Sequence, residues 1–264
     1  MDLKLNNKTA FISGSTAGIG FAIAKSLLQE GVNVIINGRT AQSVLSAVEE
    51  LSAEFKNANI TGIAADFSKV EEINELIAKL PDIDILINNA GIFEPKAFED
   101  IPDEDWFRFF DVNVMSGIRL SRHFLPKMLK KNWGRIIFIS SESAVFIPDE
   151  MIHYGMTKTA QLAISRGLAE LTKGTEVTVN SILPGPTMSK GVTGFIGDLA
   201  KSGNISVDEV EADFFKNLRP TSLLQRFASV EEIANTVTYY ASPLASATNG
   251  AAIRVEGGLV RSIL

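Results

Sequence analysis

The stretch Thr9-Ala-Phe-Ile-Ser-Gly-Ser-Thr-Ala-Gly-Ile-Gly20 joins a short apolar run to a glycine-rich turn, and it decides the fold. The run Thr9–Ile12 is apolar at successive positions rather than at alternate ones, which is typical of a strand buried on both faces. An apolar-periodic segment follows the glycines and predicts a helix beginning near Ile19. The stretch therefore predicts a strand, a tight turn and a helix, which together open a parallel α/β sheet.

Six further apolar runs predict strands, and helical patterns lie between them. These runs are Val32–Ile36, Ile60–Ala64, Ile83–Ile87, Arg135–Ile139, Val177–Ile182 and Ala252–Val255. Ser68, Ser206 and Ser229 each precede a glutamate by three residues, which fits a capping box at a helix start. Gly31 fits a helix stop, and Thr40 fits an N-cap. Because no repeat, low-complexity segment or linker interrupts the alternation, we predict one α/β domain over residues 1–264, with a parallel sheet covered by helices on both faces.

The composition excludes several classes of function. A net charge of −6 argues against nucleic acid or an anionic membrane surface as partner. The chain has no cysteine and two histidines, so it offers no thiolate nucleophile and little basis for a metal site. There is no signal-peptide core near Met1 and no apolar stretch of membrane-spanning length. We therefore expect a soluble cytoplasmic protein that binds no metal.

Tyr154 and Lys158 are four residues apart, and Ser141 follows the apolar run Arg135–Ile139. On a helix, positions i and i+4 share one face, so the phenol and the ammonium would stand side by side. A cation beside a phenol lowers its pKa and makes it a usable proton donor. A hydroxyl at a neighbouring strand end could hold a carbonyl oxygen against that phenol. Taken alone, the pair could equally be an exposed helix face with a packed tyrosine.

The glycine turn has its own two interpretations. Glycines let backbone amides approach a pyrophosphate, and the N-terminus of the following helix favours an anion. The alternative is a tight strand–helix turn without a ligand. The position after the first buried strand favours dinucleotide binding. The spacing is G-x-x-x-G-x-G, one residue longer than the common G-x-G-x-x-G.

Several motifs occur in order along the whole chain. They are Gly14-x3-Gly18-Ile-Gly20, Asn88-Asn-Ala-Gly91, Asn113 in Asp111-Val-Asn-Val114, Ser141, Tyr154-x3-Lys158 and Pro184-Gly185. The chain resembles the compact type of short-chain dehydrogenase/reductase, although Ser13 stands where that family usually has threonine. The resemblance implies a single-domain Rossmann fold, with a doubly wound seven-stranded parallel sheet, and a nicotinamide cofactor. It also implies a catalytic tetrad, namely Asn113, Ser141, Tyr154 and Lys158.

The resemblance assigns a role to each member of the tetrad. Tyr154 would exchange a proton with the substrate oxygen, and Ser141 would orient the carbonyl. Lys158 would lower the pKa of the tyrosine and bind the nicotinamide ribose. Asn113 would hold a water that links Lys158 to solvent, or it could merely satisfy backbone groups in a helix kink.

The resemblance also implies the cofactor contacts. The residues are Gly14, Ser15, Thr16, Gly18, Ile19, Gly20, Asn89, Ala90, Gly91, Tyr154, Lys158, Pro184, Gly185, Thr187 and Ser189. Asp66 would meet the adenine amino group with Phe67 beside it, or it could be a loop aspartate near Ser68. Thr187 and Ser189 would meet the nicotinamide carboxamide.

The end of the second strand bears on the choice of dinucleotide. NAD-specific Rossmann proteins place an acidic residue there for the ribose 2′-hydroxyl, but here the place is taken by Gly38. Arg39 follows with a planar fork suited to a phosphate, and Thr40 adds a hydroxyl. We therefore predict that NADP(H) is preferred and NAD(H) is possible. The alternative for Arg39 is a solvated side chain at a strand end.

A substrate lid is expected at about residues 188–220. Its apolar residues are Val192, Phe195, Ile196, Leu199, Val210, Phe214 and Phe215. A lid with an apolar inner face suits a mainly apolar ketone or a 3-oxoacyl-type substrate. The favoured function is an NADP(H)-dependent oxidoreductase acting on a carbonyl or a secondary alcohol.

Three alternatives to this function stay open: an NAD-dependent alcohol dehydrogenase, a sugar-nucleotide epimerase or dehydratase, and a non-catalytic dinucleotide sensor. Apolar positions in the helices near Trp106–Lys131 and Tyr154–Thr172 predict self-association into a dimer or tetramer. Beyond another copy of itself, the predicted partner is a small-molecule substrate.

Overall fold

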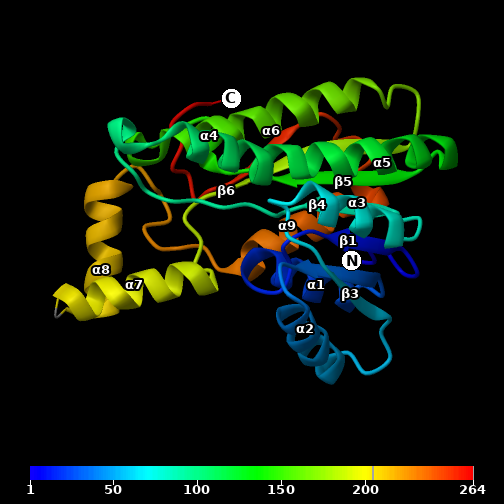
Figure 1. Cartoon of the computed structure of the whole chain (residues 1–264), viewed down its shortest axis with the longest axis horizontal. Coiled ribbons are helices and arrows are strands. Elements are labelled where there is room, and N and C mark those ends of the chain that lie inside the picture. The colour runs from blue at the N-terminus through cyan, green and yellow to red at the C-terminus, as the bar shows by residue number, and fades with distance from the viewer. Residues whose placement is uncertain (204, 264) are drawn as a thin grey trace.

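A seven-stranded parallel sheet forms the centre of the molecule, with strands in the order β3-β2-β1-β4-β5-β6-β7 (Figure 1). The computed structural model describes residues 1–203 and 205–263. The strands are β1 (Thr9–Ile12), β2 (Asn33–Gly38), β3 (Ile60–Ala64), β4 (Ile85–Asn88), β5 (Gly134–Ile139), β6 (Val177–Pro184) and β7 (Ala252–Val255). The predicted fold class, a single-domain Rossmann fold with a doubly wound parallel sheet, is confirmed.

Helices cover both faces of the sheet (Figure 1). They are α1 (Gly18–Gln29), α2 (Ala41–Glu54), α3 (Val70–Lys79), α4 (Asp103–Phe110), α5 (Ser116–Lys131), α6 (Ile152–Glu170), α7 (Lys190–Gly203), α8 (Val207–Asp213) and α9 (Val230–Ala241). Side chains of α1, α2 and α9 pack on one face of the sheet. Those of α3, α5 and α6 pack on the other face. The strand order reverses direction between β1 and β4, so the carboxyl ends of these two strands form the crevice where such sheets bind ligands.

The strands differ in burial because they differ in their place in the sheet. Strands β4, β5 and β6 are buried at every residue, as their near-continuous apolar runs predict. Strands β3 and β7 lie at the two edges and are only partly buried, so the expectation of burial on both faces is wrong for them. The predicted strand limits are correct for β1, β3 and β7, and shift by one or two residues for the others.

Two of the three predicted capping boxes are present. Ser206 and Ser229 each accept from the backbone N–H of the glutamate three residues on, and each glutamate side chain returns the contact. The third prediction, at Ser68, is wrong, because α3 begins at Val70 and its N-cap has no side-chain hydrogen bond. Ser68 instead donates both its N–H and its hydroxyl to the carboxylate of Asp66.

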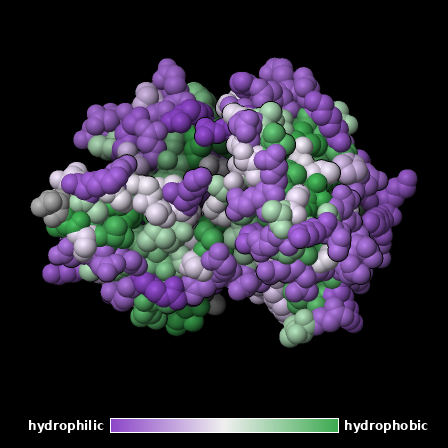
Figure 2. Space-filling view, turned by 90° about the horizontal axis from the view of Figure 1, so that it is seen from below, coloured by the Kyte–Doolittle hydropathy of each residue, from purple (hydrophilic) through white to green (hydrophobic). Residues whose placement is uncertain are grey.

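Helices α7 and α8 project from the body of the molecule at the left of Figure 1. They share a small apolar cluster with the following π-helical turn η5 (Phe214–Leu218), made of Ile196, Ala200, Val210, Phe215 and Phe227. The side chains of Phe195 and Leu199, expected in the lid, lie outside the described residues. Figure 2 shows the surface hollowed between this projecting part and the rest of the molecule. Among the described helices, none combines the length and the apolar character needed to cross a bilayer.

Candidate active site

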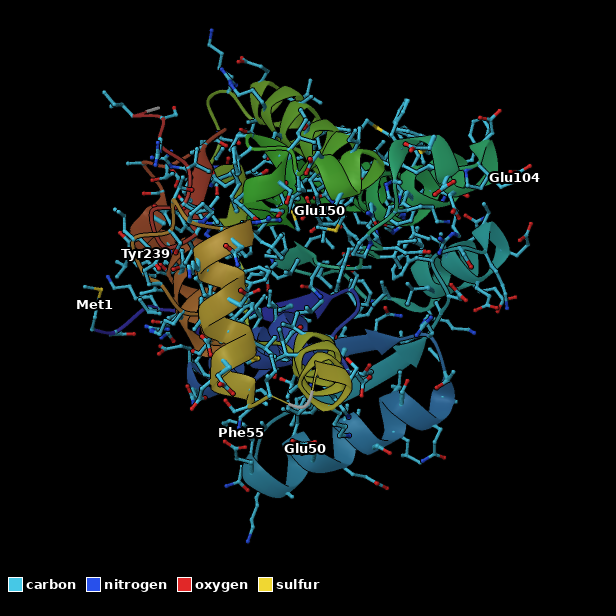
Figure 3. All side chains as sticks on the ribbon, turned by 90° about the vertical axis from the view of Figure 1, so that its left-hand side faces the viewer. Met1, Glu50, Phe55, Glu104, Glu150 and Tyr239 are labelled. Atoms are coloured by element: carbon cyan, nitrogen blue, oxygen red, sulfur yellow. The ribbon has the colours of Figure 1, made fainter. Side chains whose placement is uncertain are left out.

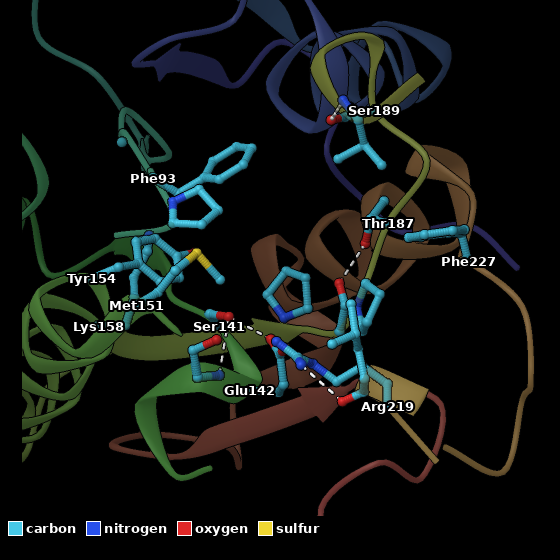
Figure 4. Close-up of a pocket in the computed structure, with 18 of the residues that line it drawn as sticks. Phe93, Ser141, Glu142, Met151, Tyr154, Lys158, Thr187, Ser189, Arg219 and Phe227 are labelled. Carbon is cyan, nitrogen blue, oxygen red and sulfur yellow. Dashed lines mark hydrogen bonds between the residues drawn. The ribbon is translucent and has the colours of Figure 1, made fainter. Parts of the chain in front are cut away.

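A cavity of about 620 Å³ lies at the carboxyl ends of the central strands, under the projecting helices (Figure 4). Ten of the predicted site residues line it: Ile19, Asn89, Gly91, Ser141, Tyr154, Lys158, Pro184, Gly185, Thr187 and Ser189. The structure thus brings together residues from four different strand ends, far apart in the sequence. A cavity of this volume is in the range of small-molecule sites.

The glycine turn leaves no room for side chains at two of its positions. A Cβ on Gly14, whose φ is +61°, would lie 3.1 Å from the Cα atom of Ala90. A Cβ on Gly20 would lie 2.5 Å from Asn89 Nδ2 and 2.6 Å from the carbonyl oxygen of Gly14. Gly18 also has a positive φ, +59°, and opens α1 directly. The turn is therefore a bare backbone cradle at a helix N-terminus, which fits a pyrophosphate.

Side chains from β2 and β4 fix this cradle. Asn89 Nδ2 donates to the carbonyl oxygens of Ser13 and Gly14, at 3.0 and 2.8 Å. Ser13 Oγ accepts from the backbone N–H groups of Asn89 and Ala90, both at 2.9 Å. Asn37 Oδ1 accepts from the N–H of Gly14 at 3.0 Å. The hydroxyl that replaces the family's usual threonine is thus fully engaged, and sequence reasoning missed the role of Asn37.

Ser15 and Thr16 occupy different places in the turn. Ser15 is fully buried, and its hydroxyl donates to the carbonyl oxygen of Ile12 at 2.7 Å, so its side chain supports the turn from inside. Thr16 faces the end of β2, where a Cβ on Gly38 would lie 2.5 Å from Thr16 Cγ2. Thr16 is therefore next to Gly38, at the end of β2, where the choice between NAD(H) and NADP(H) is predicted to be made.

Tyr154 and Ser141 both lie in the wall of the cavity. Ser141 ends the strand segment after β5 and caps a 3-10 turn, accepting from the N–H of Ser143 at 3.1 Å. Burial raises the pKa of Tyr154 above its usual range, the charge of Glu142 raises it further, and a hydrogen bond to Ser141 opposes both. The ring of Phe93 meets the tyrosine edge-on, with 6.3 Å between the centroids.

Lys158 makes its hydrogen bonds away from the phenol of Tyr154, and its effect on the pKa of that phenol stays a prediction. Its Nζ atom lies 5.5 Å from the centroid of the tyrosine ring and donates to the carbonyl oxygen of Ile139 at 2.9 Å. A longer contact of 3.4 Å reaches Gln161 Oε1. The ammonium is thus held by the backbone of β5 rather than by the phenol. Burial lowers the pKa of Lys158 to about 8.

We expect Lys158→Met to stabilise the fold at neutral pH. The unfolded lysine binds its proton more tightly than the folded one, so below pH 8 the buried charge lowers the free energy of unfolding. Removing it should add about 1–3 kcal/mol at pH 7, since the hydrogen bond to Ile139 is lost as well. Thermal unfolding of both proteins measures this difference.

The gain should shrink as the pH rises from about 8 to 10.5, because the native lysine is then already neutral. The exposed Lys173→Met serves as a control and should change stability by less than about 0.5 kcal/mol. A lower melting temperature for Lys158→Met at pH 7 would contradict the expectation.

Asn113 lies in a π-helical turn between α4 and α5 and is fully buried. Its Oδ1 accepts from the N–H of Ile92 at 2.7 Å, and its Nδ2 donates to the carbonyl oxygen of Ile92 at 2.9 Å. A Cβ on Gly91 would lie 3.5 Å from both Asn113 Oδ1 and Lys158 Nζ. The asparagine therefore satisfies backbone groups and stands near the lysine, so both interpretations drawn from the sequence agree with its position. Gln161 joins them, since its Nε2 donates to the Asn113 carbonyl oxygen at 2.6 Å.

The end of β2 presents Arg39 and Thr40 at the surface. Within the described part of the chain, Arg39 takes part in no salt bridge. Thr40 caps α2, accepting from the N–H of Ser43 at 3.2 Å, as predicted. The guanidinium is thus exposed, and its charge contributes to lowering the pKa of Asp66.

Asp66 and Phe67 follow β3. The carboxylate of Asp66 accepts from Ser68, and that contact lowers the pKa of Asp66. This is the loop geometry that the sequence left open as an alternative to an adenine contact. Phe67 is 4% exposed and packs in the core with α3 and α5, so its side chain does not face a ligand.

The segment after β6 closes one side of the cavity. A Cβ on Gly185 would lie 2.7 Å from the Cα atom of Glu256, so this glycine allows the strand to pass close to the chain after β7. Thr187 donates its hydroxyl to the carbonyl oxygen of Gly185 at 2.8 Å. The Ser189 hydroxyl oxygen stands 3.5 Å from the N–H of Val192 at the start of α7.

Five charged residues of the cavity were not found from the sequence, namely Glu142, Asp149, Glu150, Asp213 and Arg219, and two of them are buried. Glu142 is 6% exposed, lines the cavity and is hydrogen-bonded to the hydroxyl of Ser141. Arg219 is 7% exposed, also lines the cavity and pairs with Glu150 at 3.0 Å. A carboxylate directly after the predicted catalytic serine could have signalled Glu142. Arg219 belongs to no motif, and only the fold brings it here.

Known proteins resemble this chain over its full length. A family model described as short chain dehydrogenase matches residues 8–195. The uncharacterized oxidoreductase YvaG of Bacillus subtilis is 52% identical over 263 residues, covering 100% of both chains. The 3-oxoacyl-[acyl-carrier-protein] reductase of Aquifex aeolicus is 33% identical over 263 residues, covering 98% of this chain and 100% of that one. The structure of L-sorbose reductase from Gluconobacter frateurii, complexed with NADPH and L-sorbose, matches with a TM-score of 0.93 at 28% identity, covering 100% of both chains.

Proposed function

Because this chain belongs to the short-chain dehydrogenase/reductase family, we propose that it is an NADP(H)-dependent oxidoreductase that interconverts a carbonyl group and a secondary alcohol. One observation supports this above all. Ser141, Tyr154 and Lys158 line the same cavity as Ile19, which belongs to the bare glycine cradle. A proton donor, a hydroxyl and an ammonium therefore border the space next to a site that fits a dinucleotide.

The roles of the side chains follow from their positions. Tyr154 donates its proton to the carbonyl oxygen in reduction and accepts one from the alcohol in oxidation. Ser141 donates a hydrogen bond to the same oxygen and orients it. Lys158 binds the ribose hydroxyls, and Asn113, whose Oδ1 lies like Lys158 Nζ 3.5 Å from a Cβ placed on Gly91, holds a water that links the lysine to solvent. A bound nicotinamide cofactor supplies or accepts the hydride.

The proposed preference for NADP(H) depends on Arg39, which would bind the 2′-phosphate. Its guanidinium is exposed and free of salt bridges within the described residues, and Gly38 holds the place where NAD-specific proteins carry a carboxylate. The solved relative from Gluconobacter frateurii was crystallised with NADPH, in line with this proposal.

We expect Arg39→Ala to raise the KM for NADPH by about 10- to 100-fold, since a charge-assisted hydrogen bond contributes about 1.5–3 kcal/mol. The KM for NADH should change little, because NADH has no 2′-phosphate. Steady-state kinetics with both cofactors, over a mixed panel of ketones, tests this together with the function itself.

Lys56→Ala is a matched control, since it removes an exposed cation from the far end of α2. Tighter binding of NADH than of NADPH by the native protein would overturn the cofactor preference. Cofactor binding without turnover of any ketone or alcohol would favour the dinucleotide sensor.

A mainly apolar substrate is supported by the wall of the cavity. Val192 and Ile196 from α7, Val210 from α8, Phe214 from η5 and also Phe93 line it. We propose that residues 188–220 act as a lid over a ketone or a 3-oxoacyl-type substrate. Turnover confined to charged sugars would contradict this.

We also propose that the protein self-associates and that it is cytoplasmic. Phe98 and Phe107, next to and within α4, are 60% and 73% exposed. Large aromatic side chains that are exposed to solvent are typical of a protein–protein contact surface. We therefore propose a dimer or tetramer that forms through the surface of α4.

A further inference from the structure

A buried carboxyl group lies directly beside the serine of the cavity. Glu142 is 6% exposed and lines the cavity, and its Oε2 is hydrogen-bonded to Ser141 Oγ (Figure 4). The first turn after β5 places the two residues next to each other, on the 3-10 helix Glu142–Ala144. A buried carboxyl group needs hydrogen-bond partners. It can donate a hydrogen bond only when it is protonated, and it only accepts hydrogen bonds when it is ionised.

The charged groups around Glu142 come from two other elements. Helix α6 contributes Tyr154 and Lys158, and the chain after η5 contributes Arg219. Strand β6, which also packs against this turn, has no charged residue. Arg219 already donates to the carbonyl oxygen of Leu218 at 2.9 Å and to Glu150 at 3.0 Å. Its charge is thus shared with another carboxylate.

Burial is the largest influence on the acid and raises the pKa of Glu142. The hydrogen bond to Ser141, the charge of Arg219 and hydrogen bonds from the backbone of Ser143 and of Glu142 itself lower it, and burial outweighs them. Arg219 is already paired with Glu150, and the ammonium of Lys158 is hydrogen-bonded to the carbonyl oxygen of Ile139, so burial dominates and favours the neutral acid.

The hydroxyl of Ser141 has one proton and two acceptor positions. One acceptor position takes the N–H of Ser143 at 3.1 Å. If Glu142 is ionised, the serine must give its proton to the carboxylate and has none for a substrate. If Glu142 is neutral, its own O–H fills the second acceptor position. The serine proton is then directed to the side of Tyr154, where a carbonyl oxygen would be bound.

We propose that Glu142 is a positioning residue, which as a neutral carboxylic acid donates to Ser141 Oγ and directs the serine proton to the substrate oxygen. The inference rests on the proposed function of Ser141. It adds a donor chain that runs from Glu142 through Ser141 to the carbonyl oxygen, so that two hydroxyl groups, those of Ser141 and Tyr154, point at the same atom.

The chain of hydrogen bonds predicts a pH dependence. When Glu142 loses its proton, the serine turns its own proton towards the carboxylate, so kcat/KM for ketone reduction should fall as the pH rises through the ionisation of Glu142. Ionised Glu142 also raises the pKa of Tyr154, which makes the tyrosine a weaker proton donor. Both effects lower kcat/KM for ketone reduction as the pH rises.

Glu142→Gln and Glu142→Ala test the inference as a pair. The amide of glutamine donates to Ser141 at every pH, so Glu142→Gln should keep kcat within about threefold of the native value near pH 6 and lose the fall in kcat/KM. Alanine removes the donor, so kcat should fall by about 10- to 100-fold. Glu50→Gln controls for the loss of a carboxylate, since Glu50 is exposed on α2 and lies apart from Glu150 of the cavity in Figure 3.

An infrared titration of the protein without substrate gives an independent result. A protonated carboxyl band should persist above the pH at which surface carboxylates ionise, and Glu142→Gln should remove it. Absence of that band, or an unchanged fall in kcat/KM in Glu142→Gln, overturns the inference. So does a loss of activity in Glu142→Gln as large as in Glu142→Ala, with NADPH binding and melting temperature kept. Failure of every ketone in the panel would instead overturn the proposed function, and the infrared result would still decide the state of Glu142.

Discussion

Tyr154→Phe should lower kcat by about 10³-fold or more while NADPH binds with native affinity. The change removes only the hydroxyl that would supply the proton, and general acid catalysis contributes about 10²–10⁴-fold. The ring keeps its edge-on contact with Phe93, so the cavity wall should stay in place. Single-turnover kinetics measures the chemical step, and fluorescence titration measures cofactor binding.

The matched control is Tyr239→Phe, which removes a phenol that is 39% exposed on α9, away from the cavity in Figure 3. It should keep native kcat and KM. Turnover by Tyr154→Phe at the native rate would show that the proton comes from another group. Loss of NADPH binding in the same variant would instead mean that the tyrosine holds the cofactor.

Much of the fold can be predicted from local sequence, for a simple physical reason. A strand with helices on both faces has no exposed side, so β4, β5 and β6 are mainly apolar rather than alternating with exposed polar residues. The edge strands β3 and β7 have similar runs but are only partly buried. Strand order is set by tertiary pairing, and no single run of residues reveals which strand will be at an edge.

The failed prediction at Ser68 has a comparable cause. Its spacing to a glutamate fits a capping box, yet Asp66 is two residues away and accepts from both the N–H and the hydroxyl of Ser68. A short-range side-chain contact that competes with a cap is invisible to a spacing rule. Two residues before Ser229 stands Phe227, which has no side-chain acceptor, and the box at Ser229 forms.

The candidate site was predictable where backbone geometry demands a residue type. Gly14 and Gly20 are needed because neighbouring backbone fills the space of a side chain. Glu142 and Arg219 are different, because their role depends on burial and on which charges end up near them. Arg219 reaches the cavity from the chain after η5, 77 residues after Glu142 in the sequence. Only the assembled fold brings the two together.

Gly20→Ala should destabilise the protein by about 2–4 kcal/mol and raise the Kd for NADPH at least tenfold. The new Cβ would lie 2.6 Å from the carbonyl oxygen of Gly14 and 2.9 Å from Ser15 Cα, and backbone atoms cannot rotate away. It would also lie 2.5 Å from Asn89 Nδ2, the group that holds the carbonyl oxygens of Ser13 and Gly14. The cradle must therefore open, and its amides lose their alignment.

Helix propensity alone predicts the opposite sign, since alanine is more favourable than glycine in a helix by about 1 kcal/mol. Gly194→Ala isolates that contribution, because Gly194 is exposed within α7 and no described atom lies within 4 Å of a Cβ placed there. This control should gain about 0.5–1 kcal/mol and keep NADPH binding. Urea unfolding and NADPH titration of both variants measure the two effects. If Gly20→Ala had the same free energy of unfolding as Gly194→Ala, the turn would have room for a Cβ at position 20. The close backbone contacts around Gly20 would then not be what requires a glycine there.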